Sequence, residues 1–173
     1  MTTSAYTLKV ALIGTLALGL TATSTAADAQ QTQSIKNKAA SKDIQRGRYL
    51  AKIAGCNDCH TPGYAMSGGK VPEAQWLTGD KLGWRGPWGT TYPTNLRLYM
   101  AGMSEAQWVK RAKTMQTRPP MPWFALHDMS DHDLRAIYRF TKSLGPAGEP
   151  APAFVPPGQT PQGPFVQFPA PPK

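Results

Sequence analysis

The two cysteines of this 173-residue chain lie three positions apart, and a histidine follows the second, in the run Cys56-Asn57-Asp58-Cys59-His60. This C-x-x-C-H spacing is the attachment pattern of a covalently bound haem. Thiols this close can reach both vinyl groups of one porphyrin and form thioethers, and the next residue then lies under the iron. His60 would be the proximal ligand. The motif therefore predicts a fold built around one haem c.

Other uses of the two cysteines agree less well with the surrounding sequence. A thioredoxin-like site needs a βαβ context, whereas a helix is expected before Cys56 and irregular chain after His60. A disulfide between Cys56 and Cys59 would close so small a loop that it would contribute little stability. Zinc could recruit His127 and His132, but 67 residues separate Cys59 from His127, whereas a zinc finger has about 12.

The N-terminus has the layout of a secretory signal peptide. Lys9 precedes an apolar run at 10–20, small and polar residues follow, and an Ala-x-Ala site ends at Ala29. Eleven apolar residues are short for an uncleaved membrane anchor. Cleavage would leave residues 30–173 in the periplasm. That chain loses one basic and one acidic residue, so the net charge stays at +9.

The net charge of the chain is +9, and it has no long apolar run. The charge limits the classes of partner, and the lack of such a run limits the class of protein. Positive charge favours an anionic partner, and nucleic acid is discounted because the chain is expected to be exported. No apolar run reaches the roughly 20 residues of a membrane span, which excludes a multi-span membrane protein. We expect redox partner proteins with acidic docking surfaces, and a membrane complex could be the electron donor or acceptor.

Composition divides the expected mature chain into three parts. Residues 30–40 are polar with little to bury and are expected to form a flexible lead-in. Residues 41–145 carry the periodic apolar segments, both cysteines and all three histidines, and form the expected domain. In residues 146–173, 10 of 28 positions are proline, which excludes a helix or a central strand there.

Three helices are expected in this domain, with an ordered loop between the first two. Ser104 and Ser130 have the pattern of N-caps, and Gln107 and Asp133 three residues later would complete capping boxes. Residues 61–97 are rich in Gly, Pro and Trp and show no sustained apolar period, which is typical of an ordered loop. The expected helices span about 43–54, 105–117 and 131–144.

Around the motif the sequence resembles the class I c-type cytochromes. The helix that ends at C-x-x-C-H, with Gly47 nine residues before Cys56, is similar to their first helix. The Met121-Pro122 segment and the helix at 131–140 are similar to the methionine loop and C-terminal helix of bacterial members, including cytochrome subunits of periplasmic dehydrogenases. The resemblance covers the whole expected domain and implies a small all-α, monohaem fold.

The same resemblance implies that the first and last helices cross beside the haem. Gly47 and Ala51 would lie at the crossing and face Tyr138 or Phe140. The Pro-rich tail departs from the minimal pattern of the family.

Met121 is the candidate for the iron ligand opposite His60. A thioether suits a covalent haem because it favours reduced iron and raises the potential. Prolines flank Met121 on both sides and hold the chain extended, so its sulfur would be presented at little entropic cost. The alternatives are that Met121 fills the core, or that Met129 or His127 is the ligand.

Polar and aromatic side chains of the loop offer donors for the haem propionates, which need partners when buried. The alternative is a surface turn whose aromatic residues are incidental. One backbone carbonyl is also expected to accept the Nδ1 proton of His60, and that of Pro72 is a candidate. The candidate donors are Trp84, Arg85, Trp88, Tyr92, Asn95 and Arg97.

We therefore expect a periplasmic one-electron carrier, not an enzyme, because two axial ligands leave the iron no site for a substrate. One alternative is a tightly bound cytochrome subunit of a periplasmic dehydrogenase complex, with residues 146–173 as its docking arm. A further alternative is a haem enzyme with an open iron. The arm could also fold back over its own domain, because its apolar side chains are costly in water. These side chains are Phe154, Val155, Phe165, Val166 and Phe168.

Overall fold

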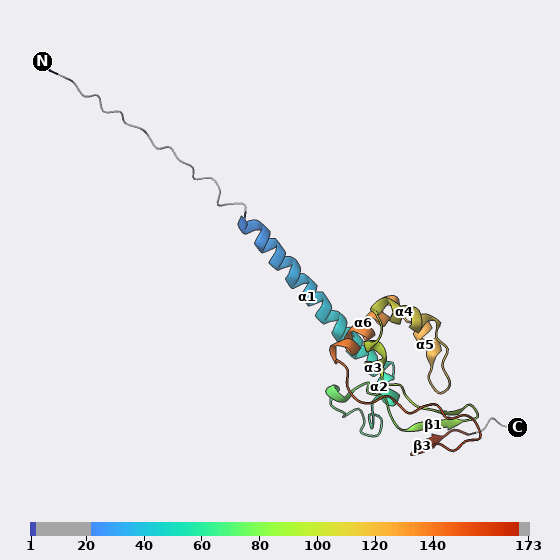
Figure 1. The fold of residues 1–173 in the computed structure, drawn as a ribbon. Coiled ribbons are helices and arrows are strands. Elements are labelled where there is room, and N and C mark those ends of the chain that lie inside the picture. Colours follow the sequence, from blue (N-terminus) through green and yellow to red (C-terminus); the bar gives the residue numbers. More distant parts are fainter. Residues whose placement is uncertain (3–21, 170–173) are drawn as a thin grey trace. The chain divides into compact units, whose positions relative to one another are not determined.

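The structure is a computed structural model that describes residues 1–2 and 22–169 (Figure 1). The apolar core of the predicted signal peptide, residues 10–20, lies outside the described residues, and the export signal stays a prediction. Within the described part, no helix combines the length and the apolar character needed to cross a membrane. The chain divides into two compact units, residues 1–38 and 39–173. All predicted site residues belong to the second unit.

The first helix, α1 (Ala22–Ile53), is much longer than the helix predicted at 43–54. The range 30–40, predicted to be a flexible lead-in, is helical. This stretch has no Gly or Pro and is rich in Gln, Lys and Ala, which favour helix. Gln33 also donates to Asn37 one turn later, over 3.0 Å. The prediction relied on an apolar face, whereas these residues are exposed and show none.

The N-caps of the later helices agree with the prediction, but the capping box expected at Asp133 does not close, because its carboxylate pairs with Arg46 over 2.9 Å. The Ser104 hydroxyl accepts from the backbone N–H of Gln107, and the Gln107 side chain accepts from the backbone N–H of Ser104. These two bonds complete a capping box. Ser130 accepts from the backbone N–H of Asp133 over 3.1 Å. Two helices of six residues each were not predicted, because so few residues show no apolar period. The elements are α2 (Cys56–His60), η1 (Glu73–Gln75), α3 (Leu96–Ala101), α4 (Glu105–Thr114), α5 (Trp123–Asp128) and α6 (Asp131–Ser143).

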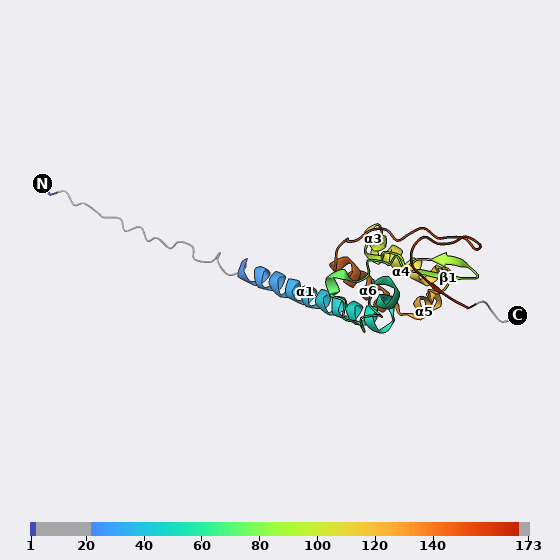
Figure 2. The same cartoon turned by 90° about the horizontal axis from the view of Figure 1, so that it is seen from below.

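The C-terminal part of α1 crosses α6, as the resemblance implied (Figure 2). A Cβ atom on Gly47 would lie 2.0 Å from the carbonyl oxygen of Ala136 and 2.7 Å from the Cβ of Phe140. Only glycine therefore fits at this point. One turn later, Ala51 is fully buried in the same cluster as Phe140.

Polar groups of α6 tie it to its neighbours. The Tyr138 hydroxyl donates to the carbonyl of Met103 over 2.7 Å, so Phe140 and not Tyr138 lies at the crossing. The Arg139 guanidinium bridges Asp43 of α1 and Glu105 of α4, with an Nε–Oε2 distance of 2.7 Å to Glu105. These ion pairs connect three helices.

Two apolar clusters form the core. The first joins Leu50 of α1 to α3, α4, α5 and α6, and there the indole of Trp108 donates to the carbonyl of Leu134 over 2.8 Å. The second joins α1 and α6 to the loop after α2. Its buried members are Ala51, Tyr64, Trp76, Leu77 and Phe140.

A small sheet corrects the all-α prediction. β1 (Gly83–Gly86) and β2 (Gly89–Thr91) form an antiparallel hairpin, and β3 (Phe165–Gln167) pairs in parallel with β1. The strand order is β2-β1-β3, so β3 is an edge strand, the position that a proline-rich segment permits. The fold is helix-rich with a sheet because the tail returns to the domain.

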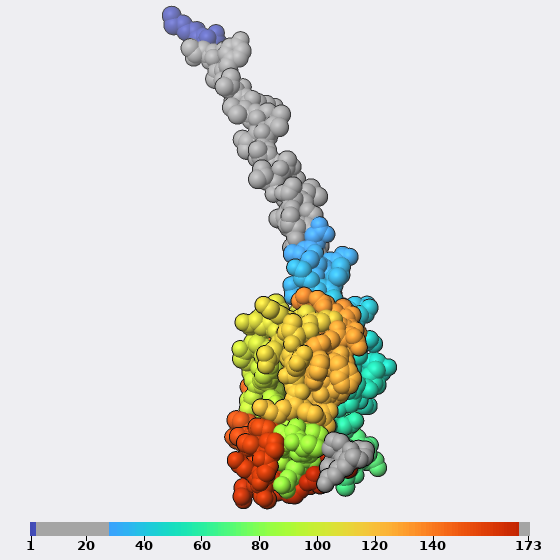
Figure 3. All heavy atoms as spheres, turned by 90° about the vertical axis from the view of Figure 1, so that its right-hand side faces the viewer, coloured from blue at the N-terminus to red at the C-terminus, as the bar shows by residue number. Residues whose placement is uncertain are grey.

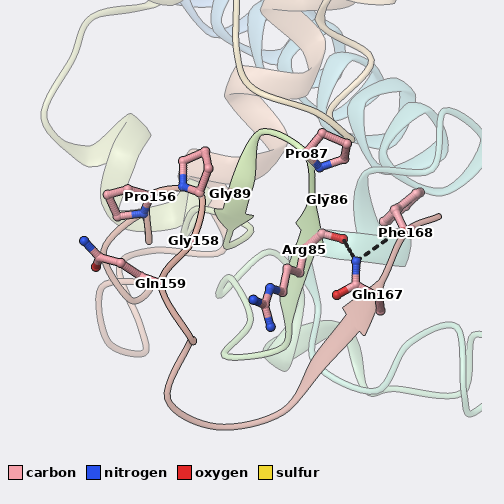
Figure 4. A pocket seen from close by; sticks show the side chains of 10 residues that line it. Arg85, Gly86, Pro87, Gly89, Pro156, Gly158, Gln159, Gln167 and Phe168 are labelled. Atoms are coloured by element: carbon pink, nitrogen blue, oxygen red, sulfur yellow. Dashed lines mark hydrogen bonds between the residues drawn. The ribbon is translucent and has the colours of Figure 1, made fainter. Parts of the chain in front are cut away.

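The tail is folded back on its own domain as far as residue 169. Val155 and Thr90 exchange backbone hydrogen bonds of 2.8 and 3.0 Å, and the N–H of Phe168 donates to the carbonyl of Arg85 over 2.7 Å. Figure 3 shows the tail, in red, against the hairpin, in green. Between them lies an open hollow of about 440 Å³, lined in part by Arg85, Gln159 and Gln167 (Figure 4).

Candidate haem site

Helix α2 carries both cysteines and the histidine on little more than one turn. Gly55 precedes it with φ 72°, a left-handed conformation that favours glycine, and this reverses the chain after α1. Cys56 and Cys59 are three residues apart in a helix and share a face. Both are free thiols. The local fold thus presents two thiols on one side of a turn that ends at His60.

The imidazole of His60 has a defined tautomer. Its side chain is buried, and Nδ1 lies 2.7 Å from the carbonyl oxygen of Thr94. A carbonyl oxygen only accepts, so Nδ1 carries the proton and Nε2 keeps its lone pair. Burial lowers the pKa of His60, partly opposed by the hydrogen bond to Thr94. A neutral imidazole with a free Nε2 is the form that binds a metal.

The predicted acceptor for His60, the carbonyl of Pro72, was wrong. That carbonyl accepts from the backbone N–H of Gln75 over 2.9 Å. Thr94 lies 34 residues beyond His60, and a main-chain acceptor carries no signal in residue type. The sequence therefore predicted the bond but could not identify the acceptor.

The end of α2 is held by further hydrogen bonds that the sequence did not reveal. The N–H of Gly79 donates to the carbonyl of His60 over 2.9 Å. The Thr61 hydroxyl donates to Oδ1 of Asn57 and accepts from the N–H of Leu77, both over 2.8 Å. Leu77 is fully buried with φ 61°, a strained conformation for a bulky residue. This Asn57–Thr61–Leu77 relay fixes a strained residue close to the histidine.

The thiols do not have the character of a thioredoxin-like site. Burial raises the pKa of Cys56 to about 11. Burial, followed by the negative charge of Asp58, also raises the pKa of Cys59. A redox-active C-x-x-C motif works with a lowered thiol pKa. The helix α1, and not a strand, also precedes α2.

The other two histidines are engaged away from the cysteines. Nε2 of His127 lies 2.9 Å from the carbonyl oxygen of Met115. His132 has 69% of its side chain exposed, and its Nε2 lies 3.4 Å from Asp43. Across residues 1–2 and 22–169, no three His, Cys, Asp or Glu side chains gather as metal ligands. The zinc interpretation therefore has no support in the described structure.

Met121 lies just before α5 and packs, partly buried, against the first apolar cluster. Met129 follows α5 and packs against the same cluster. The ammonium group of Lys113 donates to the carbonyls of His127 and Met129, over 2.9 Å to His127. Both methionines share one environment, and Met121 as the ligand stays a prediction.

Two of the predicted propionate donors have unpaired groups. The indole Nε1 atoms of Trp84 and Trp88 are buried without a hydrogen-bond partner. Their rings flank Phe168 of the tail, with centroids 5.9 and 5.4 Å from it. Arg85 stacks over Phe165 at 5.3 Å, and Tyr92 is half-buried. A buried donor without a partner costs free energy, so these indoles fit a site that supplies acceptor oxygens.

Asn95 and Arg97 have other partners than a propionate. The amide nitrogen of Asn95 donates to the carbonyls of Ala147 and Glu149, over 2.8 and 3.1 Å. The Arg97 guanidinium donates to three carbonyls, including that of Ala74 over 2.7 Å. Asn95 holds the start of the tail, whereas Arg97 holds the end of α6 at Leu144 and Gly145. Asn95 also caps α3, a role that its position before an apolar helix could have indicated.

The residues present fit a covalently bound haem. Cys56 and Cys59 are free and share a face, Nε2 of His60 keeps its lone pair, and two buried indoles need acceptors. Zinc also takes sulfur and nitrogen ligands, but no three such side chains gather among the described residues, whereas a covalent haem needs only the two thiols and one imidazole from this turn.

The chain is similar to a curated protein, the fructose dehydrogenase cytochrome subunit of Gluconobacter japonicus. The two are 29% identical over an alignment of 135 residues, which covers 72% of this chain and 26% of that subunit. The chain thus spans about a quarter of the length of this relative. No protein-family model matches the chain, and no solved structure matches it. The similarity supports a cytochrome-like protein with a role in electron transfer.

Proposed function

We propose that this chain carries one haem c and transfers single electrons as a bound cytochrome subunit of a dehydrogenase complex in the periplasm. The observation that carries the proposal is His60 at the end of the C-x-x-C turn, buried and with Nδ1 bonded to Thr94. This geometry directs Nε2 to a metal and leaves both neighbouring thiols free.

Each part of the site has a separate task. Cys56 and Cys59 would hold the porphyrin through two thioether bonds. His60 and Met121 would both be ligands of the iron. Trp84 and Trp88 would donate to the propionates. When bound, the haem supplies reversible one-electron chemistry at its iron.

A bound subunit is favoured over the freely diffusing carrier expected first from the sequence. The similar protein is itself described as a subunit of a dehydrogenase. The positive charge of this chain suits an acidic face on a partner of either kind, so it does not separate a bound subunit from a diffusing carrier. The substrate oxidised by that complex would be handled by another polypeptide, and this chain would accept the electrons.

Covalent attachment is tested directly. After denaturation and acid–acetone extraction, the wild-type chain should retain its haem and give a c-type pyridine haemochrome spectrum. Replacing both Cys56 and Cys59 by Ala should release the haem into the organic phase. Asp58→Asn is the matched control within the motif and should retain it. Release of haem from the wild type would overturn the proposal.

Membership of a complex needs a second experiment. The tagged chain should copurify from the native periplasm with a dehydrogenase polypeptide and remain bound as the salt concentration rises. A diffusing carrier would dissociate early, because its docking is mainly electrostatic and is screened. Recovery of the chain alone at physiological salt would favour the diffusing carrier.

A further inference from the structure

The start of the tail is bonded to the residue that follows the acceptor of His60. Asn95 is 2% exposed, and its amide nitrogen donates to the carbonyls of Ala147 and Glu149. Its Oδ1 accepts from the N–H of Leu98 over 3.1 Å. The amide of Asn95 therefore joins three segments: the tail, α3 and the stretch that contains Thr94.

The tail also holds the other end of this stretch. Residues 83–91 form the β1–β2 hairpin, and the chain runs directly from β2 into Thr94. Val155 pairs with Thr90, and Phe168 bonds to the backbone of Arg85. The tail thus contacts the segment before Thr94 and the residue after it.

Close packing transmits the position of Asn95 to the histidine. A Cβ atom on Gly79 would lie 2.7 Å from the backbone nitrogen of Asn95 and 2.8 Å from the carbonyl oxygen of Pro93. The N–H of the same Gly79 donates to the carbonyl of His60. Gly79 and the backbone around Asn95 are in close contact, so a shift of Asn95 must move Thr94 or the end of α2.

We propose that Asn95 is a positioning residue through which the C-terminal tail sets the hydrogen bond between His60 and Thr94. This inference rests on the proposed function. A strong bond from Nδ1 makes the imidazole a more basic ligand, which favours oxidised iron. Weakening the link from the tail to Asn95 therefore raises the midpoint potential.

Two variants test the hydrogen bonds between Asn95 and the tail, one by changing the donor and one by removing the acceptors. In Asn95→Ser, the hydroxyl can still cap α3 but cannot bridge two carbonyls, and no charge is introduced. Truncation after Pro146 removes the acceptors at Ala147 and Glu149 and leaves Asn95 intact. Ser104→Ala is the control. It also removes a helix N-cap, but the polar contacts of the Ser104 side chain are confined to its capping box with Gln107.

The readouts are the midpoint potential and the exchange of the His60 Nδ1 proton with solvent, followed by NMR. Losing both hydrogen bonds to the tail should speed exchange about tenfold, which corresponds to about 1.4 kcal/mol. We expect the ratio of reduced to oxidised protein at a fixed potential to rise about threefold, or about 28 mV for a one-electron couple. Ser104→Ala should change neither. Asn95→Ser made in the truncated protein should add no further shift.

The results separate this inference from the function on which it rests. If the haem is covalent but Asn95→Ser changes neither potential nor exchange, the inference is wrong and the function stands. An equal shift in Ser104→Ala would also refute it, by showing a general effect of destabilisation. If Asn95→Ser does not fold, the truncated protein decides the same question. If no haem binds, the function fails and proton exchange alone decides the role of Asn95.

Discussion

The two predicted axial residues differ in how the polypeptide holds them. His60 lies in a helix, donates to Thr94 through its side chain and accepts from Gly79 through its backbone. Met121 precedes a helix, and its side chain is held by apolar packing against a cluster that it shares with Met129.

The difference shows which part of the site is complete without a cofactor. Hydrogen bonds are directional, so those of His60 fix the orientation of its ring. Apolar packing is not directional, and a methionine side chain adapts to the space around it. The histidine side is built by the protein, whereas the methionine side would be completed when the haem binds.

The largest expected effect is spectroscopic and tests the methionine side. In Met121→Ala the weak absorption band of the iron–thioether bond, near the infrared edge of the oxidised spectrum, should disappear completely. The opened iron should then bind carbon monoxide, which the wild type should not. The measurement is the absorption spectrum with and without carbon monoxide.

Met129→Ala is the matched control, because Met129 packs against the same cluster. It should keep the band. Loss of the band in Met129→Ala, with retention in Met121→Ala, would transfer the ligand role to Met129. Carbon monoxide binding by the wild type would instead favour an enzyme with an open iron.

The second expected effect tests the crossing of α1 and α6 at Gly47. Gly47→Ala places a Cβ atom 2.0 Å from a backbone oxygen that cannot rotate away. We expect the free energy of unfolding to fall by about 3 kcal/mol, measured by chemical denaturation. Gly102→Ala is the control: its nearest heavy atom would be 4.0 Å away, and the loss should stay within about 0.5 kcal/mol. Equal losses in both variants would contradict this account of the crossing.

The third expected effect tests the relay beside His60. Thr61→Val leaves the N–H of Leu77 unpaired and buried, which should cost about 2 kcal/mol of unfolding free energy. Thr114→Val removes a hydroxyl that bonds within an exposed helix turn and should cost about 0.5 kcal/mol. If the histidine side is built before the haem binds, the cost at Thr61 appears in the haem-free protein too. A cost seen only with haem bound would contradict the conclusion that the protein builds the histidine side before the haem binds.

The smallest expected effect concerns the ion pairs around the crossing. The Arg139 hydrogen bond, and then that of Arg135, hold the pKa of Glu105 below its ordinary value of 4.5. A lowered carboxyl pKa in the folded state adds stability above the unfolded pKa, and that stability is lost as the pH falls through the folded pKa. Glu105→Gln should cost about 0.5 kcal/mol at pH 7 and flatten the decline of stability below about pH 4.5. An unchanged pH profile would show that the pair contributes nothing.

Local patterns in the sequence were sufficient to predict α4, α6 and their N-caps, whereas the α1–α6 crossing at Gly47 was implied by the family resemblance. The capping residues act within one helical turn, and Gly47 and the C-x-x-C-H run form recognisable spacings. The long N-terminal part of α1 was not predicted, because helix propensity without an apolar face gives no periodic signal. The helices α3 and α5 are too short to show one.

Only the tertiary structure decided how the site is supported. The motif was enough to predict Cys56, Cys59 and His60 as site residues, because their chemistry depends on spacing along the chain. The carbonyl of Thr94, the contacts of Leu77 and the return of the tail to Asn95 depend on backbone groups brought together from distant positions. Every residue except proline has both a backbone carbonyl and an N–H, so residue types do not reveal which of these groups pair. It is set by the path of the folded chain.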